Sequence, residues 1–221
     1  MKKFIMSLLA AASLSAPVLA EPNIKGYHTM DSLGCMLLRE CTDNVREIKS
    51  IKDIEDAWKG IDYSLIADEF NSMVSSLNKV GVKVFLGNHK YFPINHRGVY
   101  HTVSNNFFLN EIYMNEPNVM MRVMRHEAWH AAQDCMAGSI KNSLIAIILP
   151  EEDVPQVWRE IVEATYPKSA VPWEAEAKWA GMTEGMTAKA LKACETGKMW
   201  EIYKPTPMTE EWLRKEGYIT K

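Results

Sequence analysis

Apolar side chains recur at three- and four-residue steps through residues 65–77, and this spacing predicts a helix with one buried face. The repeating positions are Leu65, Ile66, Phe70, Met73, Val74 and Leu77. Gly81 follows and predicts the end of the helix, because glycine readily takes the left-handed conformation that closes helices. A looser stripe predicts a helix over residues 46–59, and its members are Val45, Ile48, Ile51, Ile54 and Trp58. Residues 21–45 are predicted to form an irregular arm.

Strands are predicted in the next part of the chain. Residues 82–86 form a short apolar run typical of a strand, and residues 88–97 form a loop that contains Pro93. Residues 98–110 read as a second strand or as a hairpin that turns at residues 104–106. Two or three strands are therefore expected, forming a small and mostly antiparallel sheet.

Helices dominate the remainder. One is predicted from Pro117, with Asn115 as a possible cap, to about Met136, before Gly138. Three further helical segments are expected: residues 154–164, residues 172–194 with interruptions at two glycines, and residues 210–216. A helix, a few strands and then several helices is the order of an α+β fold.

The first twenty residues resemble a secretory signal peptide. A basic start at Lys2 and Lys3 precedes an apolar run over residues 4–14, and Ala20 offers a small residue at a cleavage position. The alternative is a membrane anchor, but the run is shorter than the roughly 20 residues that a span requires. No later segment is long and apolar enough to span. The protein is expected to be periplasmic or secreted.

Composition and charge exclude one class of partner. The chain has 25 basic and 28 acidic residues, a net charge of −3, which becomes −5 when Lys2 and Lys3 are lost with residues 1–20. A mildly acidic protein has no electrostatic basis for binding nucleic acid. The 201 remaining residues are enough for one substantial core or two small ones.

Four cysteines, all after residue 20, suggest disulfides in an exported protein. We favour a local Cys35–Cys41 bridge and a long-range Cys135–Cys194 bridge, although four cysteines permit three pairings. Free buried thiols are the alternative. A cysteine-based zinc site is disfavoured because the chain has no CxxC pair.

The sequence His126-Glu127-Ala128-Trp129-His130 carries the strongest chemical signal. Histidines four apart lie on one helix face, one turn from each other, and can bind the same metal ion. Glu127 between them can reach a metal-bound water without ligating the metal, and can act as general base. Two surface histidines on an ordinary helix are the alternative reading.

Catalytic zinc generally has three protein ligands and a water. A third histidine six residues after the second would be residue 136, which is Met136, so the metzincin pattern is absent. A carboxylate is the natural substitute. We favour Glu174, because Ala177 and Gly181 near its helix face leave room for the histidine helix. The competing carboxylates are Glu176, Glu160, Glu163, Glu151, Glu152 and Asp153.

The HExxH motif followed by Glu174-Ala175-Glu176-Ala177 resembles the gluzincin zinc metallopeptidases, whose compact members carry an E-x-x-A glutamate helix. The resemblance covers roughly residues 82–194. It implies zinc held by His126, His130 and Glu174, with Glu127 as general base, in a zincin-like fold. The chain would then divide into a signal peptide (1–20), an N-terminal arm with helices (21–80), a catalytic core (81–200) and a tail (201–221).

The resemblance also implies that residues 98–110 contain the edge strand that pairs with substrate, although a plain structural hairpin is the alternative. Gln133 and Asp134 are candidates for supporting the ligands. Candidate transition-state donors are Tyr100, His101 and Tyr166. The expected activity is hydrolysis of a protein or peptide substrate. Alternatives are an amidase acting on peptidoglycan peptides, and an exported binding or inhibitory protein without turnover.

Overall fold

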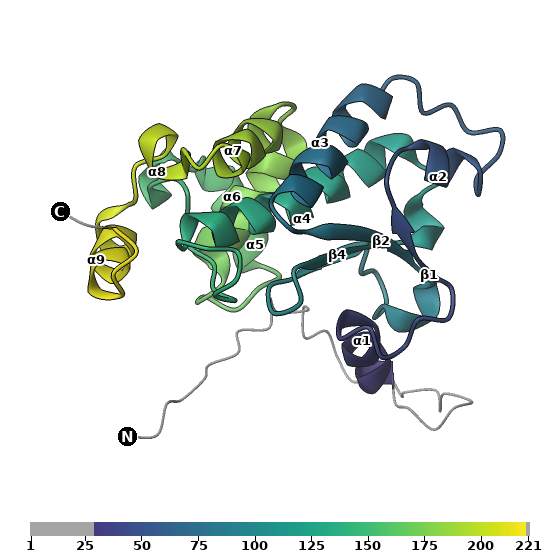
Figure 1. The fold of residues 1–221 in the computed structure, drawn as a ribbon, viewed down its shortest axis with the longest axis horizontal. Coiled ribbons are helices and arrows are strands. Elements are labelled where there is room, and N and C mark those ends of the chain that lie inside the picture. The colour runs from purple at the N-terminus through teal and green to yellow at the C-terminus, as the bar shows by residue number, and fades with distance from the viewer. Residues whose placement is uncertain (1–28, 220–221) are drawn as a thin grey trace.

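The chain forms a four-stranded mixed sheet in the order β1-β2-β4-β3; Figure 1 labels the first three of these strands. The computed structural model describes residues 29–219. The strands are β1 Val45–Ile48, β2 Lys83–Gly87, β3 Gly98–His101 and β4 Asn106–Asn110. The central pair β2–β4 is parallel, whereas β1–β2 and β3–β4 are antiparallel. The predicted α+β class, with a mostly antiparallel sheet and a 98–110 hairpin, is confirmed.

Opposite faces of the sheet pack against different helices because side chains alternate along a strand. Val84 and Phe107 belong to the main core, which lies beneath α3 Ala67–Lys79 and α4 Pro117–Met136. Phe85 and Phe108 turn to the other face and stack at 5.3 Å, where α1 Thr29–Leu37 covers them. Figure 1 shows α3 and α4 on one side of the sheet and α1 on the other.

The helix predicted over residues 46–59 is wrong, as is the irregular arm from residue 29 onward, which contains α1. Residues Val45–Ile48 pair with β2 instead, and α2 Lys52–Glu55 begins after a turn. The carboxylate of Asp53 accepts hydrogen bonds from the backbone N–H groups of Lys49 and Ser50, at 2.7 and 3.0 Å. Strand pairing and this turn outweigh a weak helical period.

Most of the other predicted elements are present. The helix α3 ends before Gly81 (φ +93°), and α4 ends at Met136 before Gly138 (φ +111°). Asn115 does not cap α4, because Glu116 occupies that position without a side-chain hydrogen bond. Short 3-10 turns lie at His89–Tyr91, Glu111–Tyr113 and Glu151–Asp153.

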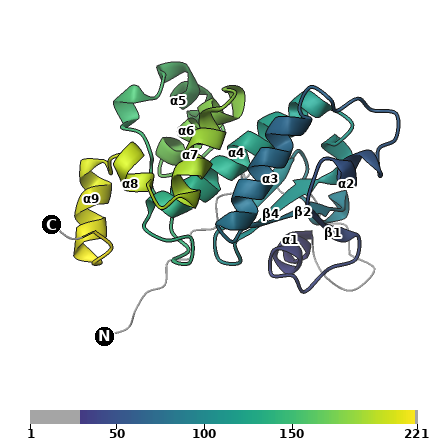
Figure 2. The same ribbon diagram turned by 45° about the horizontal axis from the view of Figure 1, so that its top comes forward.

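The C-terminal helices are α5 Gln156–Glu163, α6 Val171–Met182, α7 Met186–Glu195, α8 Met199–Ile202 and α9 Pro207–Lys215. Of these helices, α6 and α7 pack alongside α4, and α8 and α9 lie on the side of the molecule away from β1 (Figure 2). The interruption expected between residues 172 and 194 falls at Gly185, whose φ of +76° suits glycine.

Both favoured disulfides, Cys35–Cys41 and Cys135–Cys194, are present, which is consistent with an oxidising compartment. The second bridge joins the end of α4 to the end of α7. Within residues 29–219, no helix has the length and apolarity to cross a membrane. The predicted signal peptide lies outside the described residues.

Candidate metal centre

The helix α4 presents His126 and His130 on one face, as their four-residue spacing requires. Their rings lie edge to face with centroids 4.9 Å apart. His130 is buried and His126 is partly accessible. Arg125 fixes the same turn from the other side, because its guanidinium forms two hydrogen bonds with Glu69 on α3. The histidine pair therefore sits on a helix that is anchored independently of any metal.

Helix α6 brings a carboxylate to this pair because it packs unusually closely on α4. A Cβ added to Gly181 would lie 3.0 Å from the carbonyl oxygen of Arg122 and 3.2 Å from the Cβ of His126. Ala177 and Ala180 on the same helix are completely buried. The small residues anticipated from the sequence thus form the contact surface between the two helices.

Glu174, in the first turn of α6, meets the two histidines directly. Its Oε2 lies 3.4 Å from Nε2 of His126, and its Oε1 lies 3.7 Å from Nε2 of His130. One ligand atom from each of the three residues lies within 4.8 Å of the other two. The arrangement is a His-His-Glu group that can hold a metal ion.

The donor set fits a metal ion on two further grounds. Two imidazole nitrogens and a carboxylate oxygen are ligands that zinc accepts in catalytic sites. The Oε2 atom of Glu174 is buried and has no hydrogen-bond partner among residues 29–219. A buried carboxylate oxygen without a partner is costly, and a cation at this position would satisfy it.

Glu174 and the two histidines each favour the charged form of the other, and this shows in the pKa values of Glu174 and His130. Burial by itself raises the pKa of Glu174, but the charge of His130 and the contacts from both histidines outweigh burial and leave this pKa well below its ordinary value. Burial lowers the pKa of His130, yet the negative charge of Glu174 outweighs it and the pKa is raised. A metal ion would compete with protons for these same atoms.

Gln133 orients the second histidine. Its Oε1 lies 2.7 Å from Nδ1 of His130, which places the ring proton on Nδ1 and leaves Nε2 as the atom directed at Glu174. The amide nitrogen of Gln133 donates to the carbonyl of Trp173 at 3.0 Å and to Glu176 at 2.7 Å. The three-residue spacing from His130 to Gln133 was the sequence signal for this contact.

Glu176 is fully buried but does not join the metal group. Its carboxylate accepts four hydrogen bonds, whose donors are Trp129 Nε1, Gln133 Nε2, Ile148 N and Leu149 N. Burial raises its pKa to about 7, against the effect of these donors. This anchoring of the 148–149 backbone has no signal in the sequence. The other competing carboxylates, on α5 and in the 151–153 turn, are exposed.

Glu127 faces the sheet edge. Its Oε2 accepts a hydrogen bond of 2.9 Å from the backbone N–H of Tyr100 in β3. A Cβ at Gly98 would lie 3.2 Å from Cγ of Glu127 and 2.6 Å from Val123, so the edge strand lies directly against α4. The outward amide at Tyr100 is therefore already occupied, and not free for pairing with a ligand.

The three candidate donors differ in position. The Tyr100 hydroxyl donates to buried Asp134 at 2.7 Å, so it is turned into the core, and burial first of all raises the pKa of both groups. His101 instead contacts Ser104 at 2.7 Å. Tyr166, in contrast, interacts electrostatically with Glu174 and Glu127. Its pKa is raised mainly by burial and then by the charges of Glu174 and Glu127.

Comparison of the chain with protein-family models, with curated proteins and with solved structures finds no match in any of the three.

Proposed function

We propose that this protein is a zinc-dependent hydrolase that cleaves peptide bonds in an oxidising, extracytoplasmic compartment. The observation that carries the proposal is the meeting of His126, His130 and Glu174 around one point, with Glu127 adjacent on the same helix. In the proposed organisation, residues 81–200 form the catalytic core and residues 1–20 are a signal peptide.

The roles follow from the contacts. His126, His130 and Glu174 would hold zinc, which when bound lowers the pKa of a water ligand towards about 7 and polarises a carbonyl. Glu127 accepts the proton of the attacking water as the oxygen bonds to the carbonyl carbon, and then delivers that proton to the leaving nitrogen as the C–N bond breaks. The Tyr100 N–H fixes one oxygen of Glu127, which leaves the other for the water.

Tyr166 is the proposed donor to the developing oxyanion. The negative charges of Glu174 and Glu127 contribute to the raised pKa of its hydroxyl, which would therefore remain protonated at neutral pH and able to donate. Retention of Glu127 beside the three ligand candidates favours turnover over a binding or inhibitory role, because metal binding alone has no use for a base there.

The test is zinc content and peptide hydrolysis in the wild type, Glu127→Gln and Glu174→Ala. We expect Glu127→Gln to keep stoichiometric zinc and lose hydrolysis, and Glu174→Ala to lose both. Glu163→Ala, an exposed carboxylate on α5, is the matched control and should change neither. Wild-type protein without stoichiometric zinc would refute the enzymatic proposal.

A further inference from the structure

The segment between α4 and α5 has an open backbone edge that the metal centre does not use. Residues 143–147 form neither helix nor strand. Three backbone amides of residues 144–148 have partners: Leu144 N donates to the neighbouring Asn142 Oδ1 at 2.9 Å, Ala146 N to Gln133 O at 3.0 Å and Ile148 N to Glu176 Oε2 at 3.1 Å. The amides of Ile145 and Ile147 have no hydrogen-bond partner within residues 29–219. The two amides without a partner thus alternate with bonded ones, as amides do along the outer edge of a strand.

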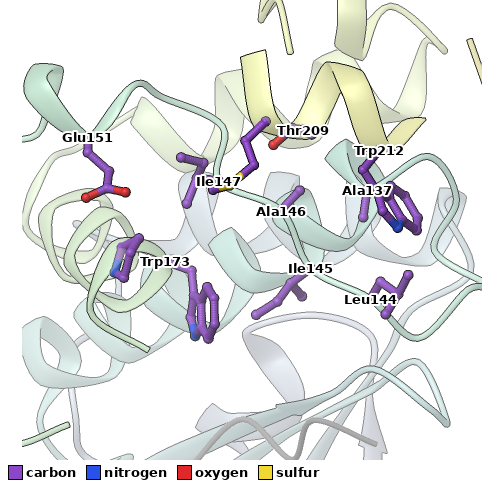
Figure 3. A pocket seen from close by; sticks show the side chains of 11 residues that line it. Ala137, Leu144, Ile145, Ala146, Ile147, Glu151, Trp173, Thr209 and Trp212 are labelled. Atoms are coloured by element: carbon purple, nitrogen blue, oxygen red, sulfur yellow. The ribbon is translucent and has the colours of Figure 1, made fainter. Parts of the chain in front are cut away.

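An apolar cavity of about 330 Å³ lies beside this segment (Figure 3). It is bounded by residues 144–147, by Trp173 at the start of α6 and by Trp212 on α9. Met208, also on α9, is 74% exposed at its wall. A cavity of this size with aromatic walls fits one or two apolar side chains.

One end of the cavity is acidic. Glu151 lines it, and Glu152 and Asp153 follow in the same exposed turn. No ion pair involves these three carboxylates within the described part of the chain. A basic group on a bound molecule would therefore be favoured at this end.

We propose that the groove formed by residues 144–147, Trp173 and α9 binds an extended peptide segment of a partner protein by strand addition. The partner's backbone pairs with the free amides of Ile145 and Ile147, an apolar side chain enters the cavity, and a basic residue lies at the Glu151 end. Backbone pairing supplies affinity and the cavity supplies selectivity.

This groove is distinct from the metal centre and does not depend on the proposed hydrolysis. Glu176, which holds the amides of Ile148 and Leu149, projects about 160° away from Glu174 around α6. One helix thus supports the metal group on one face and the open segment on another.

The test begins with a phage-displayed library of random heptapeptides selected on immobilised Glu127→Gln protein, which prevents cleavage if the proposed function is correct. The best peptide is then synthesised with a fluorophore, in an ordinary form and with alternate backbone nitrogens methylated. Affinities are measured by fluorescence anisotropy.

Met208→Glu places a charge at the cavity wall on an already exposed side chain, and Leu65→Glu is the matched control because Leu65 is 98% exposed at the start of another helix. Thermal denaturation followed by circular dichroism checks that both variants fold. We expect at least a tenfold loss of affinity with Met208→Glu and with the methylated peptide, and no change with Leu65→Glu or Glu174→Ala.

Failure to enrich any peptide would overturn the groove proposal, as would peptides that bind Met208→Glu normally. Binding that disappears in Glu174→Ala would assign the peptide to the metal centre and also overturn it. None of these outcomes alters the zinc and hydrolysis measurements, so the two proposals fail separately.

Discussion

The Cys135–Cys194 disulfide should contribute far more to stability than the Cys35–Cys41 disulfide, because it closes a much longer loop. The bridged residues are 59 apart in the first case and 6 apart in the second. A cross-link stabilises a protein largely by removing conformational freedom from the unfolded chain, and the effect grows with the logarithm of loop length. This relation gives about 4 kcal/mol for the long loop and about 2 kcal/mol for the short one.

The perturbation is a pair of alanine substitutions at each bridge, Cys135→Ala with Cys194→Ala, and Cys35→Ala with Cys41→Ala. Unfolding in urea followed by circular dichroism, with linear extrapolation to water, gives the free energy of unfolding of each protein. We expect the long-loop variant to be the less stable by about 2 kcal/mol, the difference between the two loop-closure values.

Zinc content should be little changed in the long-loop variant. The bridge ends on α7, whereas Glu174 lies on α6, which is held against α4 by the close contact at Gly181. The Thr187 hydroxyl also still ties α7 to the carbonyl of Arg125, at 2.9 Å. Equal costs for the two bridges, or a greater cost for the short one, would refute the loop-entropy reasoning.

Four further predictions concern single groups and the metal. Glu176→Gln should destabilise the protein by about 1–3 kcal/mol in urea unfolding, because an amide NH₂ would face N–H donors where the carboxylate accepts four bonds. Burial raises the pKa of Asp134 to about 8, so the folded protein favours the protonated carboxyl, and its contribution to stability is lost as pH rises from about 4 through 8. Asp134→Asn should therefore weaken the dependence of the melting temperature on pH across this range. Removal of zinc by a chelator should lower the melting temperature, because a ligand at 100 times its Kd stabilises the folded protein by about 2.7 kcal/mol. A melting temperature that does not change with the chelator would contradict the site. Tyr166→Phe should lower kcat by about 10²-fold or more with zinc retained, whereas unchanged steady-state kinetics would exclude the oxyanion role.

Local patterns in the sequence determined several elements of the fold. The apolar period of α3, the strand run of β2 and the glycine stops are properties of neighbouring residues, and they appear in the structure where predicted. The alignment of His126 with His130 is equally local, because any helix places residues four apart on one face. The spacing could therefore predict two candidate metal ligands before the fold was known.

Tertiary packing decided the rest. Glu174 and Glu176 lie on the same helix, and only the rotation of α6 against α4, fixed by the approach of Gly181 to Arg122, turns one to the histidines and the other to the 148–149 backbone. The same applies to Val45–Ile48, which pairs with β2 in spite of a helical stripe. The orientation of α6 and the pairing of Val45–Ile48 depend on backbone that is distant in sequence, and the local spacing of apolar residues does not specify where that backbone lies.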